Sequence, residues 1–255
     1  MIQGKVAMSQ GYYADALGLF RRAEAAAQAT GMPAFITLGR CVTGTCYSAI
    51  GGPYVQQATE IHAETLELSD QPMGDQMGAW VWSEIGHCAL HGGDVDSAEE
   101  LFHRAIDHRT IAMYISRPEA LQGLVEVALA RGQFEEAQAR LDELRDYVRG
   151  RDMTNALPIL LMTEARVATA SGDHEGAVAF LDECLDHLAG AGFIRTELDT
   201  HAAKVRAWKA LGAEAKARSA RSDFEAVARE ILTRIGDDDL RAAFGQSVLD
   251  MVDEV

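Results

Sequence analysis

The chain has 255 residues, of which 48% are hydrophobic, so it is long enough and apolar enough to bury a substantial core. Acidic residues outnumber basic ones by 39 to 23, and the resulting net charge of −16 argues against nucleic acid or an anionic membrane as a direct partner. The four cysteines form no CxxC pair, and no apolar run is long enough to span a bilayer, so we expect reduced thiols and a cytoplasmic location.

A glycine-centred pattern recurs along the chain every 39 to 41 residues. A bulky residue follows the marker glycine after two positions, alanine after five, a large apolar residue after nine and a smaller one after twelve. The markers are Gly11, Gly52, Gly93, Gly132, Gly172 and Gly212, of which the second and the last belong to weaker copies. The pattern predicts helical hairpins in which glycine ends the first helix in a left-handed conformation and alanine lets the second helix approach closely.

Six hairpins and a capping helix are predicted in one domain over residues 1–255, with the hairpins near 1–30, 31–70, 71–110, 111–150, 151–190 and 191–235 and the cap over 236–252. In the fourth hairpin, apolar periodicity predicts a helix over Glu119–Arg131. Ser116 as its cap and Pro118 in its first turn predict where it begins. No stretch shows the alternation of a strand, so we expect an all-α, right-handed superhelical solenoid.

The third repeat carries Trp82, Ile85, Gly86, Ala89 and Gly93 at the spacing W-x2-L-G-x2-[Y/A]-x3-G, which resembles the tetratricopeptide repeat (TPR). The resemblance covers nearly the whole chain, although these repeats are longer than the usual ~34 residues. Extended repeats of this kind resemble the C-terminal regions of bacterial signalling ATPases, including LuxR-type transcriptional regulators, and the tail 235–244 is similar to the ends of such regions. The resemblance implies a non-catalytic scaffold that binds proteins or peptides or senses a ligand as part of such a regulator. A stand-alone adaptor or peptide receptor is the alternative.

In a TPR-like superhelix the first helix of each hairpin lines the concave side, with groove positions about thirteen, ten, six and three residues before the marker glycine. The second repeat places the small or apolar Gly39, Val42, Cys46 and Ala49 there, and later repeats add Glu119 and Asp199. The predicted ligand or partner groove comprises Trp80, Ser83, His87, Gln122, Glu126, Met162, Arg166, Arg206 and Lys209. We expect recognition to centre on Trp80, His87, Glu126, Arg166 and Arg206, because packing between hairpins does not require these residues.

Such a groove suits a protein or peptide, or a small acidic ligand, since Arg166 and Arg206 can both donate to one carboxylate. The alternative for Glu126 and Arg166 is a structural ion pair between neighbouring helices.

Motifs for catalysis, cofactors and metals are missing from the sequence. It contains no GxxxxGK[ST] loop and no GxSxG elbow. His87 and His91 have the spacing of two metal ligands on a helix, but no third ligand follows, and histidines at a helix end also oppose its dipole. We therefore expect no enzyme, cofactor or metal. An all-α enzyme would require His87, Glu126 and a serine or second carboxylate to converge in a deep pocket.

The first predicted hairpin is short, since only ten residues precede Gly11. Repeat proteins need polar caps at their ends, and here Ile2, Val6 and Ala7 would face water. An upstream hairpin or a second copy of the chain would cover them, so a homodimer through the N-terminal end is a further expectation.

Overall fold

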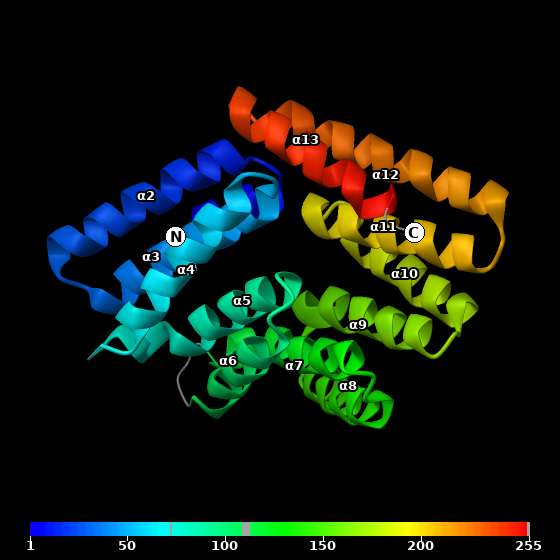
Figure 1. Cartoon of the computed structure of the whole chain (residues 1–255), viewed down its shortest axis with the longest axis horizontal. Coiled ribbons are helices and arrows are strands. Elements are labelled where there is room, and N and C mark those ends of the chain that lie inside the picture. Colours follow the sequence, from blue (N-terminus) through cyan, green and yellow to red (C-terminus); the bar gives the residue numbers. More distant parts are fainter. Residues whose placement is uncertain (72, 109–112, 254–255) are drawn as a thin grey trace.

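The computed structural model describes residues 1–71, 73–108 and 113–253, and these form thirteen α-helices and two short 3₁₀ helices without a strand. The helices are α1 (Ile2–Ser9), α2 (Tyr13–Thr30), α3 (Pro33–Ile50), α4 (Tyr54–Ser69), η1 (Gly74–Met77), α5 (Gly78–His91), α6 (Val95–Asp107), α7 (Met113–Ala130), α8 (Phe134–Arg149), η2 (Thr154–Ala156), α9 (Leu157–Ala170), α10 (His174–Leu188), α11 (Ile194–Ala210), α12 (Glu214–Arg234) and α13 (Asp238–Asp253). Consecutive helices pack against each other in chain order (Figure 1). The predicted all-α, TPR-like solenoid is confirmed.

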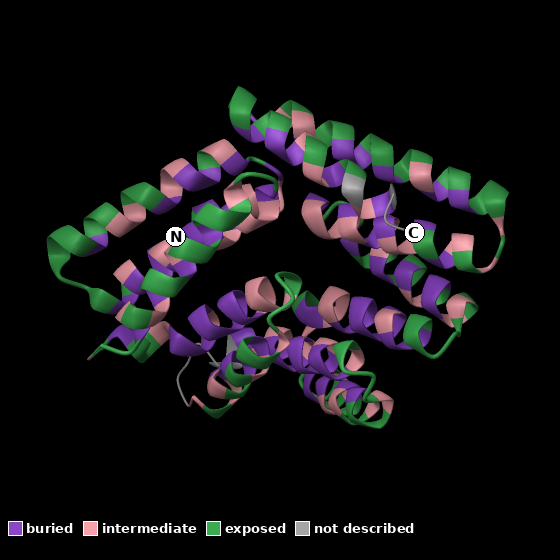
Figure 2. Ribbon diagram, viewed as in Figure 1, coloured by how far each residue is buried: buried purple, intermediate pink, exposed green. Residues whose placement is uncertain are grey.

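The marker glycines separate the two helices of each hairpin. All six have positive φ angles, from 55° at Gly52 to 85° at Gly93, a conformation that other residues rarely adopt. The alanine five residues after the marker glycine is fully buried in α6 (Ala98) and in α8 (Ala137). Figure 2 shows buried residues on the faces between neighbouring helices and exposed residues on the outer faces.

Glycines also let helices approach at the large aromatic residues. The Phe102 ring of α6 is fully buried beside Gly86 of α5 and Gly123 of α7. A Cβ atom at Gly123 would lie 2.2 Å from Cζ of that ring, so no larger residue fits without displacing it.

The predicted start of the first helix in the fourth hairpin is wrong. α7 begins at Met113, so Pro118 lies inside the helix and Ser116 is buried within it. Proline removes one backbone hydrogen bond from a helix interior. Ser116 and Ala120 on either side of it are buried by the packing of α7 on α5 and α6, and this packing outweighs the missing bond.

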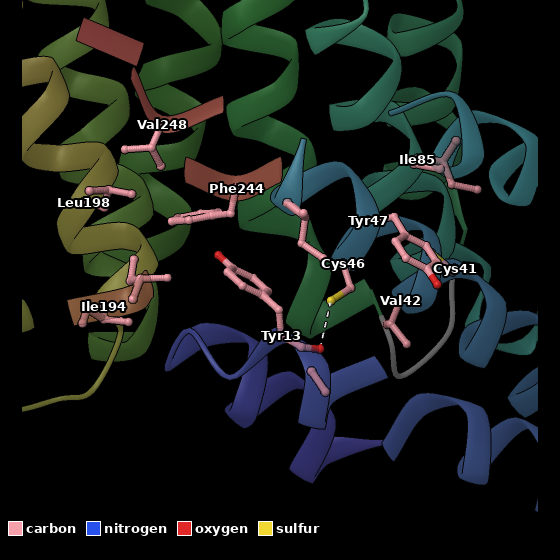
Figure 3. Close-up of a cluster of buried hydrophobic side chains, with 14 of the residues drawn as sticks. Tyr13, Cys41, Val42, Cys46, Tyr47, Ile85, Ile194, Leu198, Phe244 and Val248 are labelled. Carbon is pink, nitrogen blue, oxygen red and sulfur yellow. Dashed lines mark hydrogen bonds between the residues drawn. The ribbon is translucent and has the colours of Figure 1, made fainter. Parts of the chain in front are cut away.

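The last helix closes the row of hairpins onto its beginning. α13 contacts α3 as well as α11 and α12, and one core cluster contains buried residues from both ends of the chain. The rings of Phe244 and Tyr13 lie 5.5 Å apart between centroids (Figure 3), and both side chains are fully buried. Gly51, at the end of α3, lies against Ser247, where a Cβ atom would clash with the hydroxyl group.

Hydrogen bonds reinforce this closure. Arg195 Nη1 of α11 donates to the Ala49 carbonyl at 2.7 Å, and Arg234 Nη1 of α12 donates to the Gln10 carbonyl at 2.7 Å. From the sequence we expected an upstream hairpin or a second copy at the N-terminal end, whereas the structure places the last hairpin of the same chain against part of it. Ile2 and Val6 nevertheless remain 78% and 49% exposed.

Within the part of the chain that the structure describes, no helix combines the length and the apolar character needed to cross a bilayer. All four cysteines carry free thiols.

Candidate functional site

Three connected cavities follow the first helices of the hairpins, and we call them together the central groove. Their volumes are about 420, 390 and 250 Å³, and Arg166 of α9 lines all three. Side chains of α1, α5, α7, α9 and α11 form the walls, while α6, α8 and α12 lie on the outside of the arc (Figure 1). The first helix of five hairpins therefore faces one continuous hollow.

The cavity of about 420 Å³, which we call the basic cavity, lies between α5, α9, α11 and the end of α13. Its polar lining consists of His91, Arg166, Thr169, Arg195, Asp199 and Arg206. Arg195 Nε donates to Asp199 Oδ1 at 3.1 Å, so this pair is neutral overall. Arg206 Nη1 donates to the Met251 carbonyl at 2.9 Å, and no carboxylate among the described residues pairs with Arg206.

Two of the three arginines of this cavity, Arg166 and Arg206, lie close enough for the charge of Arg206 to act on Arg166. Burial lowers the pKa of Arg166, and the charge of Arg206 lowers it further, while Asp199 opposes the shift. Burial likewise lowers the pKa of Arg206. An anion placed between the two guanidinium groups would relieve this repulsion and receive charge-assisted hydrogen bonds from both.

The cavity of about 250 Å³, which we call the acidic cavity, lies between α1, α5, α7 and α9. Its polar lining consists of Lys5, Glu84, His87, His91, Glu119, Gln122, Glu126 and Arg166. Lys5 forms an ion pair with Glu84, and Trp80 Nε1 donates to Glu84 Oε1 at 2.9 Å. Burial opposes the ionisation of Glu84, but the charge and hydrogen bond of Lys5 hold the pKa of this carboxyl below its ordinary value.

Glu126 and Arg166 form an ion pair between α7 and α9, and Gln122 Nε2 donates to Glu126 Oε1 at 2.9 Å. The structural pairing weighed as an alternative is therefore present. The Arg166 side chain is still 38% exposed, and it lines the groove while it holds Glu126.

The two histidines of α5 both line the acidic cavity, and each bonds to a different backbone carbonyl. His87 Nε2 donates to the Glu119 carbonyl at 2.9 Å, and His91 Nδ1 donates to the His87 carbonyl at 2.6 Å. Burial, with a smaller contribution from His91, lowers the pKa of His87 to about 4, so its ring is neutral at pH 7. Across the described ranges, no three His, Cys, Asp or Glu side chains are grouped so as to hold a metal ion.

Of the remaining predicted groove residues, only Met162 lines the described cavities. It lines the basic cavity and the 390 Å³ cavity. Trp80 donates to Glu84 and lies beside Lys5, whose Nζ is 5.3 Å from the indole ring centroid, but it lines none of the three cavities. Ser83 is completely buried in α5. Lys209 Nζ donates to the Val252 carbonyl at 3.2 Å, so it holds the end of α13 and lines none of the three cavities.

The positions expected from α3 are not part of the groove. Val42 and Cys46 are fully buried, and Cys46 Sγ lies 3.9 Å from the Tyr13 carbonyl (Figure 3). These positions lie within the packing of α3 against α2 and α5, and the Cys46 contact with Tyr13 of α2 is part of it.

Some groove residues were missed from the sequence. Lys5 and Met8 line the 390 Å³ cavity and stand six and three residues before Gly11, which is the register used for the later repeats. Extending that register to the first hairpin would have found both. His91 and Arg195 stand outside the register, and Met251 reaches the groove only because α13 folds back, so no periodic signal marks them.

Residues 89–157, from the end of α5 to the first residue of α9, match the tetratricopeptide repeat family. No curated protein matches the chain. The match covers part of the third hairpin and the whole of the fourth, and the same hairpin architecture continues on both sides of it. The chain therefore folds as a TPR-like helical repeat domain.

Proposed function

We propose that this chain is a non-catalytic scaffold that binds a protein segment, a peptide or a small acidic ligand in its central groove. TPR repeats generally mediate protein–protein interaction, which supports a binding role. The observation that carries the proposal is the basic cavity. In a chain with a net charge of −16, Arg166 and Arg206 line one cavity, and no described carboxylate pairs with Arg206. A carboxylate on the ligand would complete this arrangement.

The test is a thermal-shift screen of short peptides and small acidic metabolites, followed by calorimetric titration of each hit. Arg206→Ala should weaken binding of a hit about tenfold or more, since a charge-assisted hydrogen bond contributes about 1.5–3 kcal/mol. Arg229→Ala on the exposed side of α12 is the matched control and should bind like the wild type.

Arg206 also holds α13 through the Met251 carbonyl, so Arg206→Ala alone should lower the melting temperature by about 2–4 °C, the equivalent of one hydrogen bond in a chain of this size. Wild-type affinity for every hit in the Arg206→Ala variant would remove the basic cavity from the proposal.

We also propose that the chain is the sensor region of a bacterial transcriptional or signalling regulator and acts in the cytoplasm. The forty-residue repeat and the tail 235–244 support this assignment. The coding frame upstream of Met1 tests it, because a sensor region of such a regulator predicts an ATPase domain encoded in frame. A stop codon and a ribosome-binding site there would favour a stand-alone adaptor or peptide receptor.

Homodimerisation through the N-terminal end remains part of the proposal, supported by the exposure of Ile2 and Val6. Replacing both by serine should convert a dimer into a monomer in sedimentation experiments. A wild-type chain that sediments as a monomer would contradict this interface.

A catalytic groove is the second candidate, because the acidic cavity brings His87 and Glu126 together with two further carboxylates, Glu84 and Glu119. The lowered pKa of His87 makes it a weak base at neutral pH, and its Nε2 already donates to a carbonyl. Hydrolysis of generic ester, phosphoester or glycoside substrates that disappears in His87→Gln would favour an enzyme.

A further inference from the structure

Two carboxylates of the acidic cavity, Glu84 and Glu119, lie near a single ammonium group, that of Lys5. Lys5 forms its ion pair with Glu84, and the indole of Trp80 donates to the same carboxylate. Glu119 lies near enough to Lys5 to feel its charge, but no described residue donates a hydrogen bond to the Glu119 carboxylate. Glu119 therefore lines the groove as an acceptor without a donor.

The other charged groups of this cavity do not supply the missing positive charge. Arg166 is engaged with Glu126, and Lys5 with Glu84. His87 donates to a carbonyl and is neutral at pH 7. Burial, followed by repulsion from Glu84, raises the pKa of Glu119 to about 7, as expected for a carboxylate that lacks a cationic partner of its own.

The central groove carries an unpaired carboxylate, Glu119, at one end and an arginine without a described ion pair, Arg206, at the other. Glu119 lines the acidic cavity and the adjoining 390 Å³ cavity, whose walls include the apolar side chains of Met8, Ile159, Met162 and Phe193. Beyond Met162 and Arg166 begins the basic cavity with Arg206. A carboxylate to which no described residue donates a hydrogen bond and an arginine that forms no described ion pair thus flank an apolar stretch, with Asp199 close enough to Arg206 to influence its pKa.

We propose that Glu119 binds a primary ammonium group of the ligand, so that the groove selects a zwitterionic ligand such as a short peptide, with its amino terminus at Glu119 and its carboxylate at Arg206. This inference rests on the proposed function, since it assigns the ligand class of the same groove. An ammonium group donates three hydrogen bonds and carries the positive charge that the cavity lacks. The apolar stretch between the two ends contacts the body of the ligand.

The experiment is affinity selection from a library of short, lysine-free peptides prepared in four forms, with the amino terminus free or acetylated and the carboxyl terminus free or amidated. The wild-type chain should retain the doubly free form, and acetylation of a selected peptide should weaken binding at least tenfold. Glu119→Gln should abolish the preference for the free amino terminus. The matched control Glu100→Gln, on the exposed face of α6, should keep it.

A second library with lysine in place of one residue distinguishes the source of the ammonium group. If acetylated peptides bind only when they contain lysine, the ammonium comes from a side chain, and the assignment of Glu119 still holds. Equal retention of free and acetylated lysine-free peptides, or an unchanged preference in Glu119→Gln, would overturn the inference and leave the proposed function standing. If no peptide or acidic metabolite binds in any form, the proposed function fails first.

Discussion

Phe244→Ala should separate the last hairpin from the first two without unfolding the hairpins between them. Phe244 is fully buried, and its ring contacts Tyr13 across the closure. Truncation of a buried phenylalanine to alanine costs about 3–5 kcal/mol. For a chain of this length, 1 kcal/mol corresponds to about 2–4 °C, so the melting temperature should fall by roughly 10 °C.

Phe102→Ala provides the matched control, because Phe102 is equally buried but lies between α5, α6 and α7, away from the closure. The two variants should lose similar stability in different places. Hydrogen exchange should accelerate at the end of α3, in α11 and in α13 for Phe244→Ala, and in α5 to α7 for Phe102→Ala.

Small-angle scattering provides a second measurement, since only the Phe244→Ala variant should show an increased radius of gyration. The reasoning would be refuted if the two variants gave the same exchange pattern, or if Phe244→Ala kept wild-type dimensions and wild-type amide protection at the end of α3, in α11 and in α13. The carbonyl groups of Ala49 and Gln10 accept the hydrogen bonds that join the ends.

Further predictions concern packing and protonation. Gly123→Ala should destabilise the fold by about 1–3 kcal/mol in denaturant titrations, because its Cβ would clash with the Phe102 ring. The control Gly18→Ala, on an open helix face, should stabilise the fold by up to about 1 kcal/mol. Equal effects of the two substitutions would contradict the close approach of α7 to Phe102. The raised pKa of Glu119 means that the folded chain binds the proton more tightly than the unfolded chain, so its contribution to stability is lost as pH rises through about 7. The free energy of unfolding of Glu119→Gln relative to wild type should therefore increase by roughly 2–3 kcal/mol between pH 5 and pH 8. A constant difference would show that the pKa of Glu119 is not raised in the folded chain.

The fold could be predicted from the sequence because its determinants are local. The marker glycines predict left-handed turns and the alanines that follow them predict close helix contacts, and both signals depend only on nearby residues. Counting back from the same glycines also identified residues that line the groove, among them His87, Glu126 and Arg166. The start of α7 was mispredicted because Pro118 is a local signal for a helix start, and tertiary packing overrides it there.

The rest of the site depends on contacts between distant segments. Val42 and Cys46 occupy groove positions by register but are buried, because α3 packs against α2 and α5. Glu119 lacks a donor only because Lys5, from α1, pairs with Glu84 instead. Periodicity within a hairpin carries no information about which of two carboxylates a lysine from another hairpin will contact.

The closure between α13 and α3 also limits how this protein can change its length. In an open solenoid each repeat touches only its neighbours, so a repeat can be gained or lost at a modest cost in stability. Here the insertion or deletion of one hairpin would move Phe244 away from Tyr13 and Arg195 away from Ala49. The number of repeats is therefore constrained by geometry, and lineages that retain the ring should vary in their surface residues and connections while the hairpin count stays constant.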